Sequence, residues 1–252
     1  MKTQTMLASM LTVFLSAIPT HTQAANIPQT FEDDFNRANT NGAGGGLGVN
    51  WTVPATVFVN SNVAKTQTAG EQLAIYNSVT LSDSLTLSAN VYAQSDGRYV
   101  GLIFNYTDAS NYSLLRFNFH TTETTQWQFI ERTTGTNTVV DSGSIKTGDM
   151  PLNTWRKVSI VSTSTAGQYT FSITNSDGTT SYASKTITSQ SATPTLTGNA
   201  GLYFGNSYIW ADNFTLTTNV APVPEPATLS LLLGSAFFSA AFIWRKRNTT
   251  HR

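Results

Sequence analysis

The feature of the sequence that most restricts its fold is a series of short segments in which apolar and polar side chains alternate. Residues 112–120 place Phe117 and other large apolar side chains at one parity, and residues 126–132 do the same with Trp127. A period of two is the repeat of a β-strand, whose successive side chains point to opposite faces of a sheet. No window between the two ends of the chain shows a convincing helical repeat, so an all-β domain is expected.

The two alternating segments are expected to pair as a hairpin through residues 121–125. The predicted register pairs Asn118 with Gln128 and Arg116 with Ile130, because a slip of one residue would mix the polar and apolar faces. The apolar face then collects Phe117, Phe119, Trp127 and Phe129, which are expected in the core.

The opposite face of this hairpin is a candidate ligand-binding surface, because amide and guanidinium groups beside an aromatic ring suit sugars. We call it the predicted polar face, and its residues are Tyr112, Arg116, Asn118, His120, Gln126 and Gln128. The alternative is an ordinary solvated outer sheet face. End loops with Tyr208 and Trp210 are an equal candidate for ligand contact.

Further strands are expected at many short intervals. Another hairpin is predicted around Asp177-Gly178, with Tyr169, Phe171 and Ile173 on its apolar side. The other candidates are residues 72–77, 84–92, 97–106, 137–141, 154–162, 181–188, 199–205 and 208–217. Many short strands with turn signals between them predict a β-sandwich or barrel.

The end of the chain carries a different kind of signal. Val223-Pro224-Glu225-Pro226 is followed by an uncharged apolar run, residues 227–244, and then by a basic tail, residues 245–252. As a helix the run would rise about 27 Å, enough to cross a bilayer core. The basic tail places the C-terminus in the cytoplasm and the preceding chain outside.

These three features in this order resemble a PEP-CTERM sorting signal (residues 221–252). The resemblance implies an exosortase that cleaves near the Pro-Glu-Pro motif and passes the protein to the surface of a Gram-negative cell. Until then the protein is anchored in the inner membrane. The alternative is an ordinary C-terminal anchor.

The start of the chain agrees with export. Lys2, an apolar stretch and small residues at positions 22–25 predict a signal peptide, residues 1–25, which signal peptidase removes after Ala24 or Ala25. The part between the two ends, residues 26–220, is expected to be one domain.

Composition restricts the chemistry of this domain. It carries thirteen carboxylates against nine Lys and Arg residues, and this net charge of about −4 argues against a nucleic-acid partner. The sequence has no cysteine, which excludes disulfides, thiolate zinc sites and a thiol nucleophile.

Short motifs along residues 31–217 resemble concanavalin A-like, laminin-G-like jelly-roll domains. They are Asp33-Asp34-Phe35-Asn36-Arg37, Gly48-Val-Asn-Trp51, Tyr99–Phe104 with Asp108–Tyr112, Asn153-Thr-Trp155, Gly201–Phe204 and Asp212-Asn-Phe214. The resemblance implies a two-sheet antiparallel β-sandwich with adjacent first and last strands. It also implies a structural Ca²⁺ near that junction, for which Asp34 and Asp212 are the expected ligands. The alternative is that both are turn or cap residues.

The sequence predicts a non-catalytic function. The hydrolases of the superfamily that these motifs resemble carry Glu-x-Asp-x-x-Glu on one strand. This spacing occurs nowhere in the chain, so no catalytic residue is assigned. We therefore expect a surface or extracellular-matrix protein that associates with exopolysaccharide. A glycan-cleaving hydrolase on the same fold and a structural matrix protein without a specific ligand remain the alternatives.

Overall fold

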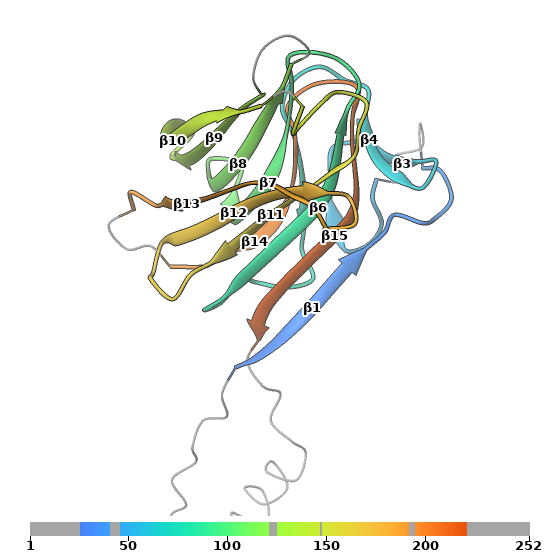
Figure 1. Cartoon of the computed structure of the whole chain (residues 1–252). Helices are drawn as coiled ribbons and strands as arrows, with labels where there is room; N and C mark the ends of the chain where they lie inside the picture. Colours follow the sequence, from blue (N-terminus) through green and yellow to red (C-terminus); the bar gives the residue numbers. More distant parts are fainter. Residues whose placement is uncertain (1–25, 41–45, 121–124, 147, 192–194, 221–252) are drawn as a thin grey trace, which may run out of the picture. The chain divides into compact units, whose positions relative to one another are not determined.

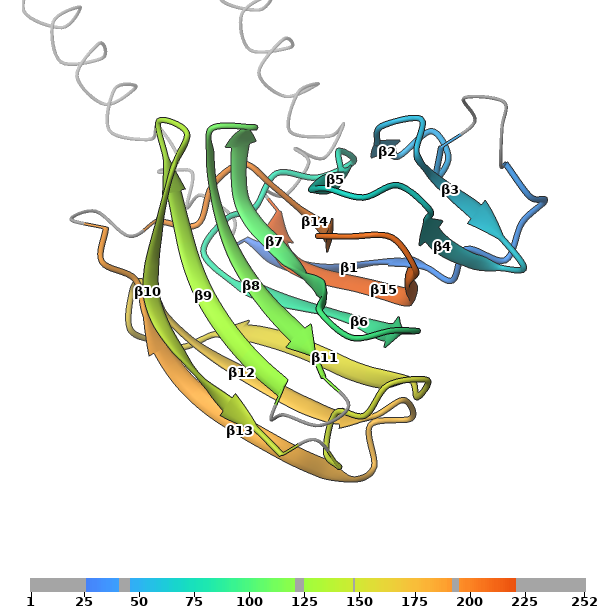
Figure 2. The same ribbon diagram turned by 90° about the horizontal axis from the view of Figure 1, so that it is seen from above.

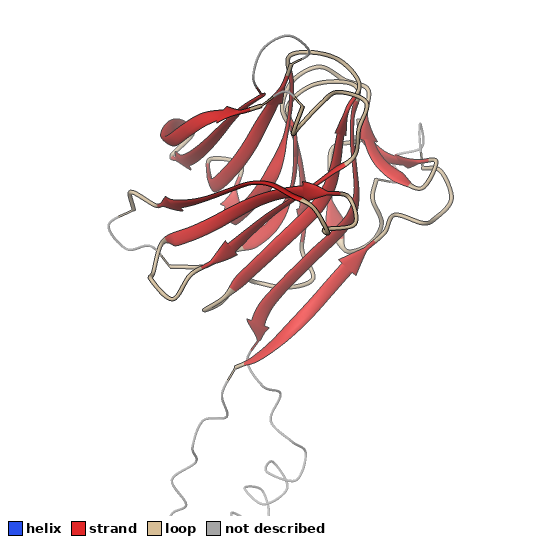
Figure 3. Cartoon of the chain, in the orientation of Figure 1, coloured by secondary structure: helices blue, strands red, loops and turns tan. Residues whose placement is uncertain are grey.

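Fifteen β-strands account for the regular structure of the residues that the computed structural model describes, which are 26–40, 46–120, 125–146, 148–191 and 195–220 (Figure 1). Within these ranges there is no helix (Figure 3). Consequently none of the described residues belongs to a helix that could cross a membrane. The predicted signal peptide, the Val223–Pro226 motif and the predicted span 227–244 lie outside the described residues.

The strands form two sheets, and their registered pairs are antiparallel. The eight-stranded sheet has the order β13–β12–β11–β6–β15–β4–β3, and β1 pairs with β15. Its strands are β1 (Ile27–Asp33), β3 (Val57–Asn60), β4 (Val63–Thr66), β6 (Leu85–Ala93), β11 (Arg156–Ser162), β12 (Gln168–Asn175), β13 (Ser181–Thr188) and β15 (Ile209–Val220).

The seven-stranded sheet has the order β10–β9–β8–β7–β14–β5–β2 (Figure 2). Its strands are β2 (Trp51–Thr52), β5 (Gln72–Tyr76), β7 (Arg98–Asp108), β8 (Asn111–Phe119), β9 (Thr125–Thr133), β10 (Thr136–Ile145) and β14 (Asn199–Phe204).

Aromatic rings from both sheets meet in the core between them. Trp127 of β9 packs against Phe171 of β12 at 4.8 Å between ring centroids, and Phe104 of β7 lies 4.9 Å from Tyr169 of β12. Phe117, Phe119, Trp127 and Phe129 are all buried in this cluster. The alternation along each strand therefore places one apolar face of each sheet against the other, as in a sandwich.

The expected fold class, an all-β two-sheet antiparallel sandwich, is confirmed. The first and last strands, β1 and β15, pair along one edge region of the eight-stranded sheet (Figure 1). The strands β1, β2, β3 and β4 are not among the predicted ones, and β10 and β15 are longer than expected.

The predicted register of the β8–β9 hairpin is wrong by two residues. Asn118 pairs with Gln126, and Arg116 pairs with Gln128, not with Ile130. A shift of two keeps every side chain on its expected face. The observed register is the better one because it places Ile130 opposite Leu114, where both are buried, and lets Arg116 bond to the Gln128 amide.

Candidate functional site

The outer face of the seven-stranded sheet carries most of the predicted polar face. Arg116 on β8 donates from Nε and Nη2 to Gln128 Oε1 at 2.9 and 2.7 Å, because the register sets the two residues opposite each other. The same guanidinium lies 4.4 Å from the ring centroid of Tyr99 and donates from Nη1 to Tyr203 Oη at 3.4 Å. Arg116 thus contacts side chains of three other strands, β7, β9 and β14.

An acidic residue balances the arginines on this face. Tyr203 Oη donates to Glu71 Oε1 at 3.0 Å, and Arg132 Nη1 lies 3.6 Å from Glu71 Oε2. Burial, and then the charge of Glu71, raises the pKa of Tyr203 far above its ordinary value, so the phenol stays protonated and keeps donating. Arg116, Tyr203, Glu71 and Arg132 therefore form one connected chain of polar groups.

Tyr112 does not present an exposed ring. It is buried in a small second apolar cluster, 6.1 Å from Tyr106, with the Arg132 guanidinium 5.7 Å from its ring centroid. Tyr112 and Arg132 are direct cross-strand partners on β8 and β9. Burial, and then the charge of Glu71, raises the pKa of Tyr112.

Two hollows adjoin at this pair of residues, and we call them together the groove. The Glu131 hollow, of about 520 Å³, is lined by Glu131, Asn105, Tyr169 of β12 and residues 189–191, 195 and 197. The Glu71 hollow, of about 470 Å³, is lined by Glu71, Ile75 and the β2–β3 connection. Tyr112 and Arg132 line both hollows. The groove therefore combines apolar walls with charged groups, which is the composition of a ligand site.

The remaining predicted residues line neither hollow. Asn118 Nδ2 lies 2.9 Å from His120 Nε2, Asn118 is nearly buried, and Gln126 is exposed. In the described part of the chain, two buried side-chain polar atoms have no hydrogen-bond partner, Asn118 Oδ1 and Arg132 Nε. Both atoms lie on the outer face of the seven-stranded sheet, and Arg132 lies at the groove.

Arg132, Glu71 and Tyr203 are groove-side residues that the sequence did not assign to a site. The parity of Arg132 predicts that it shares the polar face of the hairpin with Gln128 and Gln126, but Arg132 was not among the candidate ligand residues. Glu71 and Tyr203 gave no local signal. They reach Arg116 and Arg132 only because β5 and β14, distant in sequence from β8, lie in the same sheet.

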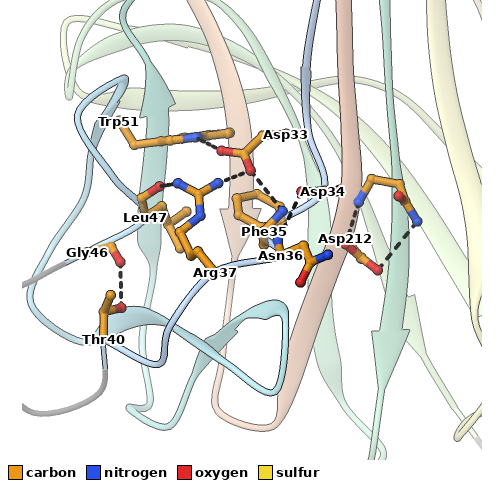
Figure 4. A network of polar contacts seen from close by, with 11 residues as sticks. Asp33, Asp34, Phe35, Asn36, Arg37, Thr40, Gly46, Leu47, Trp51 and Asp212 are labelled. Carbon is orange, nitrogen blue, oxygen red and sulfur yellow. Dashed lines mark hydrogen bonds and ion pairs between the residues drawn. The ribbon is translucent and has the colours of Figure 1, made fainter.

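The motif Asp33–Arg37 forms a structural clamp (Figure 4). Asp33 Oδ1 accepts from Phe35 N at 2.8 Å and from Arg37 Nη2, while Asp33 Oδ2 accepts from Trp51 Nε1 at 2.8 Å. Arg37 also donates from Nη1 to Leu47 O at 2.7 Å. One carboxylate thus ties the end of β1 to β2 and to the glycine-rich connection before it.

The nominated metal ligands Asp34 and Asp212 lie in one region beside this clamp (Figure 4). Asp34 Oδ1 accepts from Asn36 N at 3.0 Å, as turn residues do, whereas Asp212 Oδ1 accepts from Asn213 N at 2.8 Å at a register irregularity within β15. Burial, and then the charges of Asp34 and Asp33, raises the pKa of Asp212. Like-charged carboxylates that disfavour each other are a donor set suited to a hard cation. No group of three acidic or histidine side chains with metal-site geometry occurs in the described ranges.

Two carboxylates lie within the groove. Glu131 accepts from Ser189 Oγ and from Gln190 N at 3.2 Å, whereas Glu71 is engaged by Tyr203 and Arg132. Glu123 lies outside the described residues. Each described carboxylate of the groove is thus already held by hydrogen-bond donors.

Comparison with known proteins separates the two parts of the chain. Residues 222–247 match the PEP-CTERM protein-sorting motif. No curated protein matches the sequence.

Solved structures resemble the β-sandwich. The acidic lectin of winged bean, complexed with methyl-α-D-galactose, has a TM-score of 0.53 and 10% identity, over 77% of this chain and 99% of the lectin. The CBM2 module of the evolved Dit protein of Lactobacillus casei BL23 phage J-1 has a TM-score of 0.51 and 11% identity, over 79% of this chain and all of that module (100%). Xylan β-1,4-xylosidase of Bacillus halodurans C-125 has a TM-score of 0.52 and 12% identity, over 74% of this chain and 38% of the enzyme.

At these identities the structural likeness concerns the fold alone. It agrees with the concanavalin A-like jelly roll that the short motifs predicted. The chain therefore carries a PEP-CTERM protein-sorting motif after a jelly-roll β-sandwich, and it is an exported protein directed to the cell surface.

Proposed function

We propose that the β-sandwich binds a glycan of the cell envelope or extracellular matrix in the groove at Tyr112 and Arg132. The observation that carries this proposal is the pair of adjoining hollows that share these two residues. The lectin and the CBM2 module of similar fold support the ligand class by analogy only.

The groove offers the groups that sugar recognition needs. Arg132 can donate from its guanidinium N–H groups, and Glu71 can accept from sugar hydroxyls. Leu73 and Tyr106 supply apolar surface for the C–H faces of a pyranose.

The experiment is a calorimetric titration of the full chain, in a detergent without a sugar headgroup, with exopolysaccharide from the producing cell. Arg132→Ala should weaken binding at least tenfold, which corresponds to about 1.4 kcal/mol. Arg132→Lys should fall between, because lysine keeps the charge without the planar fork. Lys185→Ala, a charge-matched control on β13, should bind like the wild type. Equal affinities for Arg132→Ala and the wild type would refute the groove as the site.

A glycan-cleaving reaction is the second candidate, because Glu131 and Glu71 lie in adjoining hollows of one groove. The non-catalytic function is favoured here because hydrogen-bond donors already hold both carboxylates.

The remaining assignments concern export and metal. The proposal includes a signal peptide 1–25, a domain 26–220, and an exosortase that reads Val223–Pro226 while residues 227–244 anchor the chain in the inner membrane of a Gram-negative cell. Asp34 and Asp212 remain the proposed Ca²⁺ ligands. Ca²⁺ should then raise the melting midpoint relative to EDTA. Equal midpoints would refute the proposed Ca²⁺ site.

A further inference from the structure

Three aromatic rings gather on the outer face of the other sheet, the eight-stranded one. Tyr92 of β6 stacks on Trp210 of β15, with ring centroids 4.4 Å apart and planes at 10°. Trp155, which directly precedes β11, lies 5.3 Å from Tyr92 and 6.5 Å from Trp210. We call these three residues the aromatic platform.

The strand pairing explains why these rings meet on the outside. Trp210 is the cross-strand partner of both Tyr92 and Lys65. The neighbours in sequence, Val91 and Ala211, are buried in the core, so the alternating residues between and beside them face outward. The platform is therefore a row across adjacent strands and not part of the core.

The rings of the platform differ in what covers them. Trp210 lies between the parallel ring of Tyr92 and the Lys65 ammonium, which is 4.4 Å from its centroid. Trp155 is tilted by 42° and 46° to the other two rings and has no parallel ring partner among the described residues. All three rings are partly exposed. Trp155 is thus the ring that can accept a flat ligand, and the Tyr92–Trp210 pair supports it from the side.

Polar groups border the platform at the end where β6 stops. Tyr92 Oη donates to Asn153 Oδ1 at 3.0 Å, and the exposed Asn153 amide has its nitrogen left for a ligand or solvent. The Asn153 backbone is left-handed, with φ of 56°, and its N–H bonds to Ala93 O at 2.9 Å. Tyr208, with φ of 63°, is 51% exposed beside the same strand end. Left-handed backbone at non-glycine residues costs free energy and is concentrated at binding sites.

We propose that the aromatic platform binds a pyranose unit of a polysaccharide, with the sugar ring stacked on Trp155 and a hydroxyl bonded to the Asn153 amide. A tryptophan face next to a planar amide and an ammonium is the combination that serves the two sides of a sugar, apolar C–H groups and hydroxyls. A protein partner would need a larger apolar patch than three partly covered rings provide.

A second glycan site on the opposite sheet gives the protein a matrix function. This step rests on the proposed function of the groove. The Glu71 hollow of the groove and the platform lie on the outer faces of two different sheets of one sandwich, so one molecule can hold two polymer chains. Binding at two sites raises the apparent affinity and joins the chains into a network.

The test measures two quantities for the full chain with exopolysaccharide purified from the producing cell, in a detergent without a sugar headgroup. The first is apparent affinity, and the second is cross-linking, followed by the size of polymer particles in light scattering. Trp155→Ala should lower the apparent affinity at least tenfold and abolish cross-linking. Trp155→Phe should stay within about threefold of the wild type, because a stacking ring remains. Asn153→Gly fits the left-handed backbone and should weaken binding without loss of the fold.

The groove variant Arg132→Ala separates the two proposals. If both sites bind, Arg132→Ala and Trp155→Ala each abolish cross-linking but keep residual binding. If only the platform binds, Trp155→Ala removes all binding and Arg132→Ala has no effect, which refutes the groove alone. Wild-type affinity and cross-linking in folded Trp155→Ala, or a wild type that does not bind, would overturn the platform.

Discussion

At the scale of single residues, Asp33 illustrates how a motif in the sequence can hold the fold together. Its carboxylate is 9% exposed and accepts hydrogen bonds from Trp51 Nε1, Arg37 and Phe35 N. The neighbouring Asp34 has a bond from Asn36 N. Of the two adjacent aspartates, Asp33 is therefore expected to contribute more to the stability of the fold than Asp34.

Asp33→Ala is expected to lower the free energy of unfolding by about 2–4 kcal/mol, because it leaves the Trp51 indole and the Arg37 guanidinium without their acceptor. Asp34→Ala is the matched control and should cost less than about 1 kcal/mol when EDTA is present. Urea denaturation of both variants measures the difference. Equal losses would contradict the clamp.

The raised pKa of Tyr203 predicts that the stability of the fold depends on pH in the alkaline range. Its pKa is raised in the folded protein by burial and by Glu71, so its contribution to stability is complete below the ordinary tyrosine pKa of about 10 and is lost as the pH rises above it. Tyr203→Phe should cost about 1–2 kcal/mol at pH 7 through the lost bond to Glu71. The variant should then lose less further stability than the wild type between pH 8 and pH 10.5 in urea denaturation. Parallel losses in the two proteins would show that Tyr203 does not titrate as proposed.

Residues close in sequence could be assigned correctly, and residues joined by the sheet could not. The alternation on β8 and β9 placed Arg116 and Gln128 on one outer face, where the structure shows them hydrogen bonded. Glu71 and Tyr203 complete that network from strands far away in the chain. A sequence pattern carries no record of which distant strands become neighbours.

At the scale of elements, strands with several alternating apolar residues were predicted, whereas the largely exposed β1 and the short β2, β3 and β4 were missed. The clearest omission is the β3–β4 hairpin, where Asn60 pairs with Val63 across a two-residue turn. Ser61 and Asn62 have φ of 54° and 61°, as a type I′ turn requires. Serine and asparagine are a weaker turn signal than Asn-Gly, which explains why this hairpin was not identified.

The double variant Ser61→Asn, Asn62→Gly should stabilise the protein by about 0.5–1 kcal/mol, because Asn-Gly adopts this turn at the lowest cost. Ser61→Val should destabilise it, since a β-branched residue disfavours positive φ. Thermal unfolding of both variants tests the turn type. A lower melting temperature for the Asn-Gly variant would contradict it.

The register of β8 and β9 shows a further limit at this scale. Period-two alternation fixes which face a residue occupies but leaves shifts of two residues undecided. The pairing of Leu114 with Ile130 decides the register, and it depends on a small apolar cluster on the outer face that also contains Tyr203 and Ile75. Those partners come from other strands.

At the scale of the whole molecule, the chain joins a surface-sorting motif to a jelly-roll β-sandwich. The sorting motif was identified from sequence because its parts are contiguous and occur in a fixed order. The sandwich was predicted because alternation is a local property. The groove was not predicted, because its walls come from β2, β5, β7, β8, β9, β10 and β12 and from connections between strands.

Sorting is expected to depend on Pro224 and Glu225. The double variant Pro224→Ala, Glu225→Ala should leave the full-length protein in the membrane fraction of the producing cell, because exosortase would no longer recognise the motif. Fractionation and immunoblotting compare it with a Thr249→Ala control in the tail. Normal release of the double variant would show that the C-terminal segment is only an anchor or that another protease removes it.

We propose that the protein binds a surface polymer without cleaving it. The most direct measurement incubates the full chain with exopolysaccharide from the producing cell and determines both the bound fraction and the polymer length by size-exclusion chromatography with light scattering. We expect saturable binding and a polymer chain length that is unchanged once the protein is removed. Shortened polymer would contradict the non-catalytic function, and the absence of binding would contradict the glycan-binding function.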